Sequence, residues 1–160
     1  MEIKIREIIE DDYAAVASMW NNELGYGNVS ADTIAQHMAR MNINEHYKTL
    51  VAISENNVIG FITMVKILAF EFDIGYLKVD ALAVRENCQK QGVGTSLLKY
   101  AENYAIEKGL TELLLNSGFQ RTNAHMFYER YGFEKKSYCF KKKILIQNDY
   151  NICFIHKELP

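Results

Sequence analysis

Apolar residues at the start of the chain follow first the spacing of a strand and then that of a helix. The opening strand has its apolar side chains on one side, at Ile3, Ile5 and Ile8. The acidic residues 10–12 end this strand because they favour a helix start. The apolar positions of the next helix keep the i, i+3, i+4, i+7 spacing of one buried face: Tyr13, Val16, Ala17, Trp20 and Leu24. Residues 25–27, Gly-Tyr-Gly, are expected to end that helix.

The next segments predict a second helix and three strands. Ser30 is expected to cap the helix, whose apolar stripe consists of Ile34, Met38 and Met41. Residues 49–54 and 58–65 are rich in β-formers, and the polar residues between them predict an antiparallel hairpin. A third strand is expected over residues 76–84. The intervening residues 66–75 fit either a loop over a site or an extension of a strand.

The second half of the chain predicts a strand–helix–strand unit and a terminal hairpin. A helix over residues 92–108 is stopped by Gly109, and a short buried strand over residues 110–116 should run parallel to residues 76–84. A last helix over residues 123–131 ends at Gly132. Two final strands are expected, over residues 133–146 and 150–157. The order β-α-α-β-β-β-α-β-α-β-β predicts an α/β fold with a mixed sheet (α+β), in one domain spanning residues 1–160.

The composition is that of one compact soluble domain without a strong overall charge. The 160 residues are 49% apolar and 24% charged, and 18 Lys and Arg against 20 Asp and Glu give a net charge of −2. This balance gives the protein no overall positive electrostatic potential that would attract nucleic acid, so we expect no nucleic-acid partner. We also expect no membrane span and no export signal, and three cysteines without CxxC spacing favour a reducing cytoplasm.

The strongest chemical signal is the junction between the strand over residues 76–84 and the helix after it. Residues 89–95 read Gln-Lys-Gln-Gly-Val-Gly-Thr. Glycines let a backbone approach a ligand closely, and the free N–H groups of a helix's first turn attract phosphate. Because Lys90 is the only formal positive charge there, anion binding would depend on main-chain geometry more than on charge. A pair of glycines at such a junction can also serve structure alone.

Two common phosphate loops do not fit this segment. A Walker A loop needs GxxxxGK[ST], and the dinucleotide fingerprint GxGxxG would need a third glycine where Leu97 stands. The pattern that remains, Gln/Arg-x-x-Gly-x-Gly/Ala after a parallel strand, resembles that of the GNAT superfamily of acyl-CoA-dependent N-acetyltransferases. The similarity extends to Leu-Ala-Val at residues 82–84 and to an Asn…Ala…Phe-Tyr…Gly-Phe signature within residues 123–133. The predicted order of elements also agrees with that fold.

The resemblance implies acetyl-CoA as co-substrate and indicates the residues that would bind it. In the family, the strand corresponding to residues 82–84 hydrogen-bonds the pantetheine arm through its main chain, in a splay between two parallel strands. Here these would be the strands that end at Val84 and Asn116. The cofactor-binding residues implied by the family pattern are Leu82, Ala83, Val84, Gln89, Lys90, Gln91, Gly92, Val93, Gly94, Thr95 and Asn123.

Two residues are candidates for the catalytic proton transfers. Tyr128 matches the family tyrosine that protonates the departing thiolate, a task suited to a phenol with a pKa of about 10. Its alternative role is packing in the aromatic face of its helix. The amine must lose a proton before it attacks, and Asp80 is the first candidate for the base, although a charge satisfied at a strand edge fits it equally well. Some family members use a glutamate where Asn116 stands, which cannot act as a base, and Glu71 and Asp73 are weaker candidates.

The remaining titratable and nucleophilic residues point to no metal site and no covalent intermediate. The four histidines, at positions 37, 46, 125 and 156, show neither HxH nor HExxH spacing, so we expect no metal. Cys88 precedes the phosphate loop, but such a cysteine is more often a small apolar residue, and direct transfer needs no acyl-cysteine.

Taken together, these residues predict an N-acetyltransferase that moves the acetyl group of acetyl-CoA directly to the primary amine of a small molecule. Residues 116–121 resemble those of members that act on small amines such as aminoglycosides. A protein N-terminal or lysine acetyltransferase and a non-catalytic acyl-CoA-binding sensor are the alternatives. The apolar terminal strands would permit a homodimer.

Overall fold

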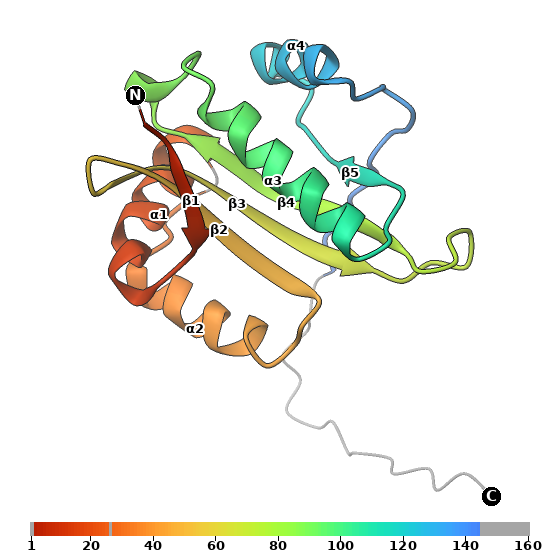
Figure 1. The fold of residues 1–160 in the computed structure, drawn as a ribbon, viewed down its shortest axis with the longest axis horizontal. Coiled ribbons are helices and arrows are strands. Elements are labelled where there is room, and N and C mark those ends of the chain that lie inside the picture. The colour runs from red at the N-terminus through yellow and green to blue at the C-terminus, as the bar shows by residue number, and fades with distance from the viewer. Residues whose placement is uncertain (1, 26, 145–160) are drawn as a thin grey trace, which may run out of the picture.

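The computed structural model describes residues 2–25 and 27–144 and shows a twisted sheet with helices on both faces (Figure 1). The five strands lie in chain order across the sheet: β1 (Lys4–Glu7), β2 (Tyr47–Ser54), β3 (Asn57–Ile67), β4 (Tyr76–Val84) and β5 (Leu113–Leu115). Strands β1 to β4 pair antiparallel, and β5 runs parallel to β4. The expected α/β architecture with a mixed sheet is therefore confirmed.

The helices divide between the two faces of the sheet (Figure 1). The first two, α1 (Tyr13–Met19) and α2 (Ala31–Met41), cover one face, and α3 (Val93–Glu107) covers the other. The last helix, α4 (Thr122–Tyr131), lies beyond the N-terminal part of α3. Each face has its own apolar core, and the side chains of β2, β3 and β4 alternate between the two.

The predicted helix ends agree closely with the structure. Ser30 caps α2 by accepting a hydrogen bond from the N–H of Thr33 at 3.1 Å. The first predicted helix is longer than α1 because a π-helical turn, η2 (Trp20–Leu24), continues it to Gly25, which takes a left-handed φ of 71°. Such turns widen a helix locally and are frequent near functional sites.

The segment between β3 and β4 was expected to be either a loop or an extension of a strand, and each expectation holds for part of it. β3 continues to Ile67, and residues 68–75 then form the loop that leads into β4. This loop contains Glu71 and Asp73 and enters β4 at its start, whereas residues 85–92 leave the strand at its opposite end.

Two strand predictions are wrong: one strand is shorter than expected, and one segment expected to be a strand has no regular structure. The strand expected over residues 110–116 is reduced to the three residues of β5. Residues 133–144, expected to be a strand, form no regular element, and their side chains at Tyr138, Phe140 and Ile144 are exposed. A strand is stable only where a neighbour supplies ladder hydrogen bonds, and β5 offers very few. The rest of that strand and the one expected over residues 150–157 lie outside the described residues.

An ion pair between the half-buried Arg6 and the buried Asp12 fixes the turn from β1 into α1. The guanidinium of Arg6 donates to both carboxylate oxygens of Asp12, at 2.6 and 2.9 Å, and the N–H of Ile9 donates to the same carboxylate at 2.8 Å. Asp12 is only 4% exposed. Burial alone raises the pKa of this carboxyl, but the hydrogen bonds from Arg6 and Ile9 outweigh it and hold the pKa below its ordinary value.

We predict that Asp12→Asn destabilises the fold by about 2–3 kcal/mol at pH 7, because Arg6 loses its counter-charge. A carboxyl whose folded pKa is lowered stabilises fully above its unfolded pKa and loses that contribution as the pH falls through the folded pKa. The difference between variant and parent should therefore shrink on acidification, as measured by urea unfolding. As a control, Glu134→Gln removes an exposed pair with Lys136 and should cost less than about 0.5 kcal/mol. A difference that stays constant with pH would contradict this account.

Candidate active site

Strand β4 loses its regular pairing on both sides near Asp80. On the β3 side, Thr63 pairs with Ala81 and the following β3 residue pairs with Val79, so Asp80 is the extra residue of a β-bulge. On the β5 side, the parallel ladder stops at the pair Val79 and Leu115. Beyond this point, β4 has a neighbouring strand on one side only among residues 2–25 and 27–144. The splay expected between these two strands stays a prediction, because β5 itself ends at Leu115.

The bulge also reverses the side-chain alternation of β4. Val79 packs into the core under α3, whereas Ala81 and Ala83 pack into the core under α1. Leu82 and Val84 pack, half-buried, against the core under α3. Within the described residues, the edge of β4 over residues 80–84 therefore offers main-chain N–H and C=O groups that have no strand beside them. An extended ligand that carries amides can complete this arrangement.

The loop after β4 delivers a run of unpaired main-chain donors to the same end of the sheet. Within residues 2–25 and 27–144, no acceptor lies within hydrogen-bond reach of the N–H groups of residues 90–95, and the first helical bond runs from Ser96 to the carbonyl of Gly92 at 2.9 Å. No side chain caps α3. Lys90 and Gly92 both take left-handed φ values, 59° and 87°, and left-handed residues are typical of main-chain nests that bind anions. This geometry suits a diphosphate.

The loop is held in place by hydrogen bonds back to the sheet. The side chain of Gln89 donates to the carbonyl of Val84 at 3.0 Å, and the side chain of Arg85 donates to the carbonyl of Val58 at 2.7 Å. The main-chain N–H of Arg85 also donates to Ile59. Gln89 thus supports the loop rather than extending from it, while Lys90, Gln91 and Thr95 are exposed.

Helix α4 packs its aromatic face against the start of α3. A Cβ atom on Gly94 would lie 3.1 Å from the ring of Phe127, so this glycine permits the close approach of the two helices. Tyr128, one residue on, is 9% exposed and lies 5.3 Å from Phe127 and 5.7 Å from Phe133, centroid to centroid. Asn123, in the first turn of α4, is exposed.

Burial sets the proton affinity of Tyr128. Loss of water around the ring raises the pKa of its phenol, and the positive charge of nearby Arg121 opposes this shift only in part. The hydroxyl of Tyr128 has no hydrogen-bond partner among the residues that the structure describes. The group therefore keeps its proton through the neutral range and can donate it to a developing anion.

A cavity of about 260 Å³ lies on the other face of the sheet, between β2–β4 and the helices α1 and α2. Asp80 reaches its lining because the bulge turns this side chain toward α1 and α2. The Asp80 side chain is 55% exposed, and one of its oxygens lies 3.8 Å from the Nζ atom of Lys78. The carboxylate is thus the partner of Lys78 and also lines the cavity, so its position is compatible with an ion-pair role and with a role as base.

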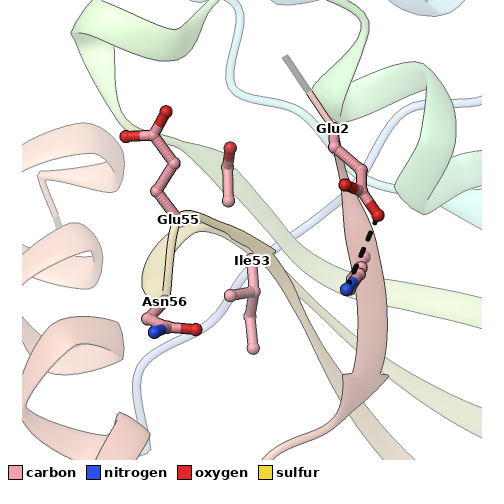
Figure 2. A pocket seen from close by; sticks show the side chains of 6 residues that line it. Glu2, Ile53, Glu55 and Asn56 are labelled. Carbon is pink, nitrogen blue, oxygen red and sulfur yellow. Dashed lines mark ion pairs between the residues drawn. The ribbon is translucent and has the colours of Figure 1, made fainter.

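A second hollow, at the start of β1 and the β2–β3 turn, lacks the features of an active site (Figure 2). Glu2, Ile53, Glu55 and Asn56 line it, and its ion pair between Glu2 and Lys4 at 3.5 Å is largely exposed. None of the residues expected to bind cofactor or move protons lines this hollow.

The structure also shows the contacts and the exposure of the other residues that the sequence analysis considered. The Nε2 atom of His125 lies 3.0 Å from the carbonyl of Gly118, which braces the turn from β5 into α4. Cys88 packs against the core under α3. Asn116, directly after β5, is exposed. In the described part of the chain, no cluster of three or more His, Cys, Asp or Glu side chains could hold a metal ion, and no helix is both long and apolar enough to cross a bilayer.

The cavity itself was not predicted from the sequence. Trp20 and His37 line it, one from the π-helical turn and one from α2. The available signal was the pair of threonines, Thr49 and Thr63, which face each other across β2 and β3 at inward positions of otherwise apolar strands. Polar residues on the inner face of a strand indicate a site rather than a core.

Comparison with known proteins finds one family and several relatives. The model of the Acetyltransferase (GNAT) family matches residues 6–133. The uncharacterized N-acetyltransferase YhdJ of Bacillus subtilis (strain 168) is 39% identical over 70 residues, which are 43% of this chain and 49% of that protein. This match thus spans about half the length of that relative.

A second relative and a solved structure match over more of the chain. The aminoalkylphosphonate N-acetyltransferase of Salmonella typhimurium is 27% identical over 136 residues, 82% of each chain. An aminoglycoside acetyltransferase from an uncultured soil metagenomic sample, solved in complex with trehalose, superimposes with a TM-score of 0.77 at 21% identity, covering 89% of this chain and 97% of that one. At that identity the superposition establishes the fold.

We predict that Gly92→Val weakens CoA binding by about tenfold or more, because a β-branched residue resists the left-handed φ that directs the loop's N–H groups. Isothermal titration with CoA measures the affinity. The matched control is Gly27→Val, since Gly27 has a φ of 99° and equally open surroundings but lies in the α1–α2 loop. Equal CoA affinity in the two variants would show that residues 90–95 do not form the diphosphate site.

Proposed function

Because the chain belongs to the GNAT family of acetyl-CoA-dependent N-acetyltransferases, we propose that it transfers the acetyl group of acetyl-CoA directly to the primary amine of a small molecule, in the cytoplasm. The observation that carries this proposal is the meeting of two features at Asp80. In the described part of the chain, the pairing of β4 with β5 stops at Val79, directly before Asp80, and Asp80 lines the cavity under α1 and α2. A thioester along the edge and an amine in the cavity would share one junction.

The residues of the edge and the loop fit the co-substrate. The unpaired N–H groups of residues 90–95 would hold the diphosphate, and the main chain of residues 82–84 would pair with the amides of the pantetheine arm. Asn123, on the first turn of α4, would contact the same arm. A main-chain N–H near Leu82 would polarise the thioester carbonyl, since no strand of the described part of the chain occupies that side of β4.

The reaction then requires two proton transfers. The amine nitrogen forms a bond to the carbonyl carbon, the C–S bond breaks, and the amine gives up one proton while the thiolate gains one. Asp80, at the end of the cavity, would take the proton of the amine directly or through water. Tyr128 would give its proton to the thiolate, because its raised pKa keeps the phenol protonated.

Names of the relatives support a small acceptor. The Salmonella relative is named for aminoalkylphosphonates and the metagenomic neighbour for aminoglycosides, both of which are small molecules with amines. The cavity in this chain is likewise sized for a small molecule rather than for a folded protein.

We predict that Tyr128→Phe lowers kcat about 100-fold with little change in CoA affinity, because the thiolate loses its proton donor. Thiol release during steady-state turnover measures kcat. Tyr131→Phe is the matched control: its hydroxyl donates to Glu102 at 3.3 Å, and burial together with this carboxylate raises the pKa of Tyr131 to about 12. That variant should keep kcat within about threefold of the parent. An unchanged kcat in Tyr128→Phe would exclude the acid role.

We predict that Asp80→Asn lowers kcat/KM for the amine about 100-fold, since an amide cannot accept the proton. Lys78→Met is the control, because it removes only the ion-pair partner of Asp80 and should change kcat/KM little. If Asp80 merely pairs with Lys78, both variants will show the same small loss.

A further inference from the structure

The walls of the cavity under α1 and α2 are apolar, and its shape is held before any ligand arrives. Trp20 stacks on Phe61 at 6.1 Å between centroids, with ring planes 18° apart. The side chain of Asn21 forms two hydrogen bonds with the main chain of Val29, at 2.8 and 2.9 Å, and so fixes the α1–α2 loop beside the opening. From α2, Ile34 and Met38 complete the wall.

The cavity carries charge at one place only. Among the described residues that line it, Asp80 is the single carboxylate, His37 is the one other titratable side chain, and there is no lysine or arginine. A second ammonium on the acceptor would have no carboxylate to pair with, and a phosphonate or carboxylate would find no lysine or arginine, only the imidazole of His37. An unpaired charge against apolar side chains is unfavourable.

The volume limits the acceptor as well. A cavity of about 260 Å³ has room for a small molecule and not for a large one. The floor contributes two hydroxyls, Thr49 and Thr63, in the same row of the sheet as the bulge at Asp80. From the helices, Thr33 and His37 of α2 add two further polar side chains to a lining that is otherwise apolar there.

We propose that the acceptor is a primary monoamine with a compact, uncharged apolar body, such as an arylalkylamine. Its ammonium lies at Asp80, next to the open edge of β4, and its body lies against Trp20, Ile34 and Met38. This inference rests on the proposed acetyl transfer and separates the chain from relatives named for aminoglycosides and aminoalkylphosphonates.

The test compares amines on the full-length protein with saturating acetyl-CoA, with release of free thiol as the readout. The probes are phenethylamine, spermidine, kanamycin, 2-aminoethylphosphonate and a lysine-containing peptide. Phenethylamine should give a kcat/KM at least tenfold above each of the others. A preference for any other probe overturns the inference about the acceptor but leaves acetyl transfer intact. Thiol release with none of them, in a protein that still binds CoA, overturns the proposed function instead.

A charge placed on the cavity wall gives a second, independent readout. Ile34→Arg should raise KM for phenethylamine about tenfold and lower KM for 2-aminoethylphosphonate, because the guanidinium repels one ligand and pairs with the other. Gln36→Arg adds the same charge on an exposed position of α2 and should change neither. Unchanged CoA affinity verifies the fold of each variant. If both variants leave the two KM values unchanged, amines do not bind in this cavity; if Ile34→Arg fails to fold, the amine panel on the parent protein still decides the proposal.

Discussion

The functional arrangement depends on one local break in strand pairing. At Asp80, β4 gains an extra residue relative to β3 and, at the same point, loses its ladder with β5. The bulge turns one carboxylate toward the helices α1 and α2, and the end of the ladder frees the edge of the strand for an extended ligand. A regular β4, paired on both sides, would have neither property. The two halves of the proposed reaction meet where the sheet is least regular.

The rest of the fold keeps that break in a fixed place. Gly60 of β3 lies so close to α3 that a Cβ atom there would stand 3.0 Å from Val93 and from the carbonyl of Ala83. This contact sets the first residue of α3 directly against β3 and β4, so the free N–H groups of the helix start beside the open strand edge. Gly94 does the same for α4 through Phe127. Small residues at helix contacts therefore position the donors and Tyr128 around one end of β4.

Sequence alone predicted the elements whose signals are local. Ser30, the glycines at helix ends and the alternation in residues 76–84 each act within a few residues, so the helix ends and β4 were placed almost to the residue. Pairing between strands depends on distant partners, and here the predictions were weaker: the strand after α3 is much shorter than expected, and residues 133–144 form none. The bulge left no local signature, because Asp80 reads as one polar position in an alternating strand.

The same distinction explains why the proposed acetyl-CoA site can be recognised in the sequence, whereas the proposed acceptor site cannot. The proposed acetyl-CoA site uses main-chain groups, so it demands glycines and a strand–helix junction at fixed spacing, and such a motif can be recognised in one segment. The proposed acceptor site uses side chains from α1, η2, α2 and three strands, which no single segment reveals. Its chemistry can change through one side chain at a time without disturbing β4 or α3. A common cofactor motif is therefore compatible with an acceptor unlike those for which the relatives are named.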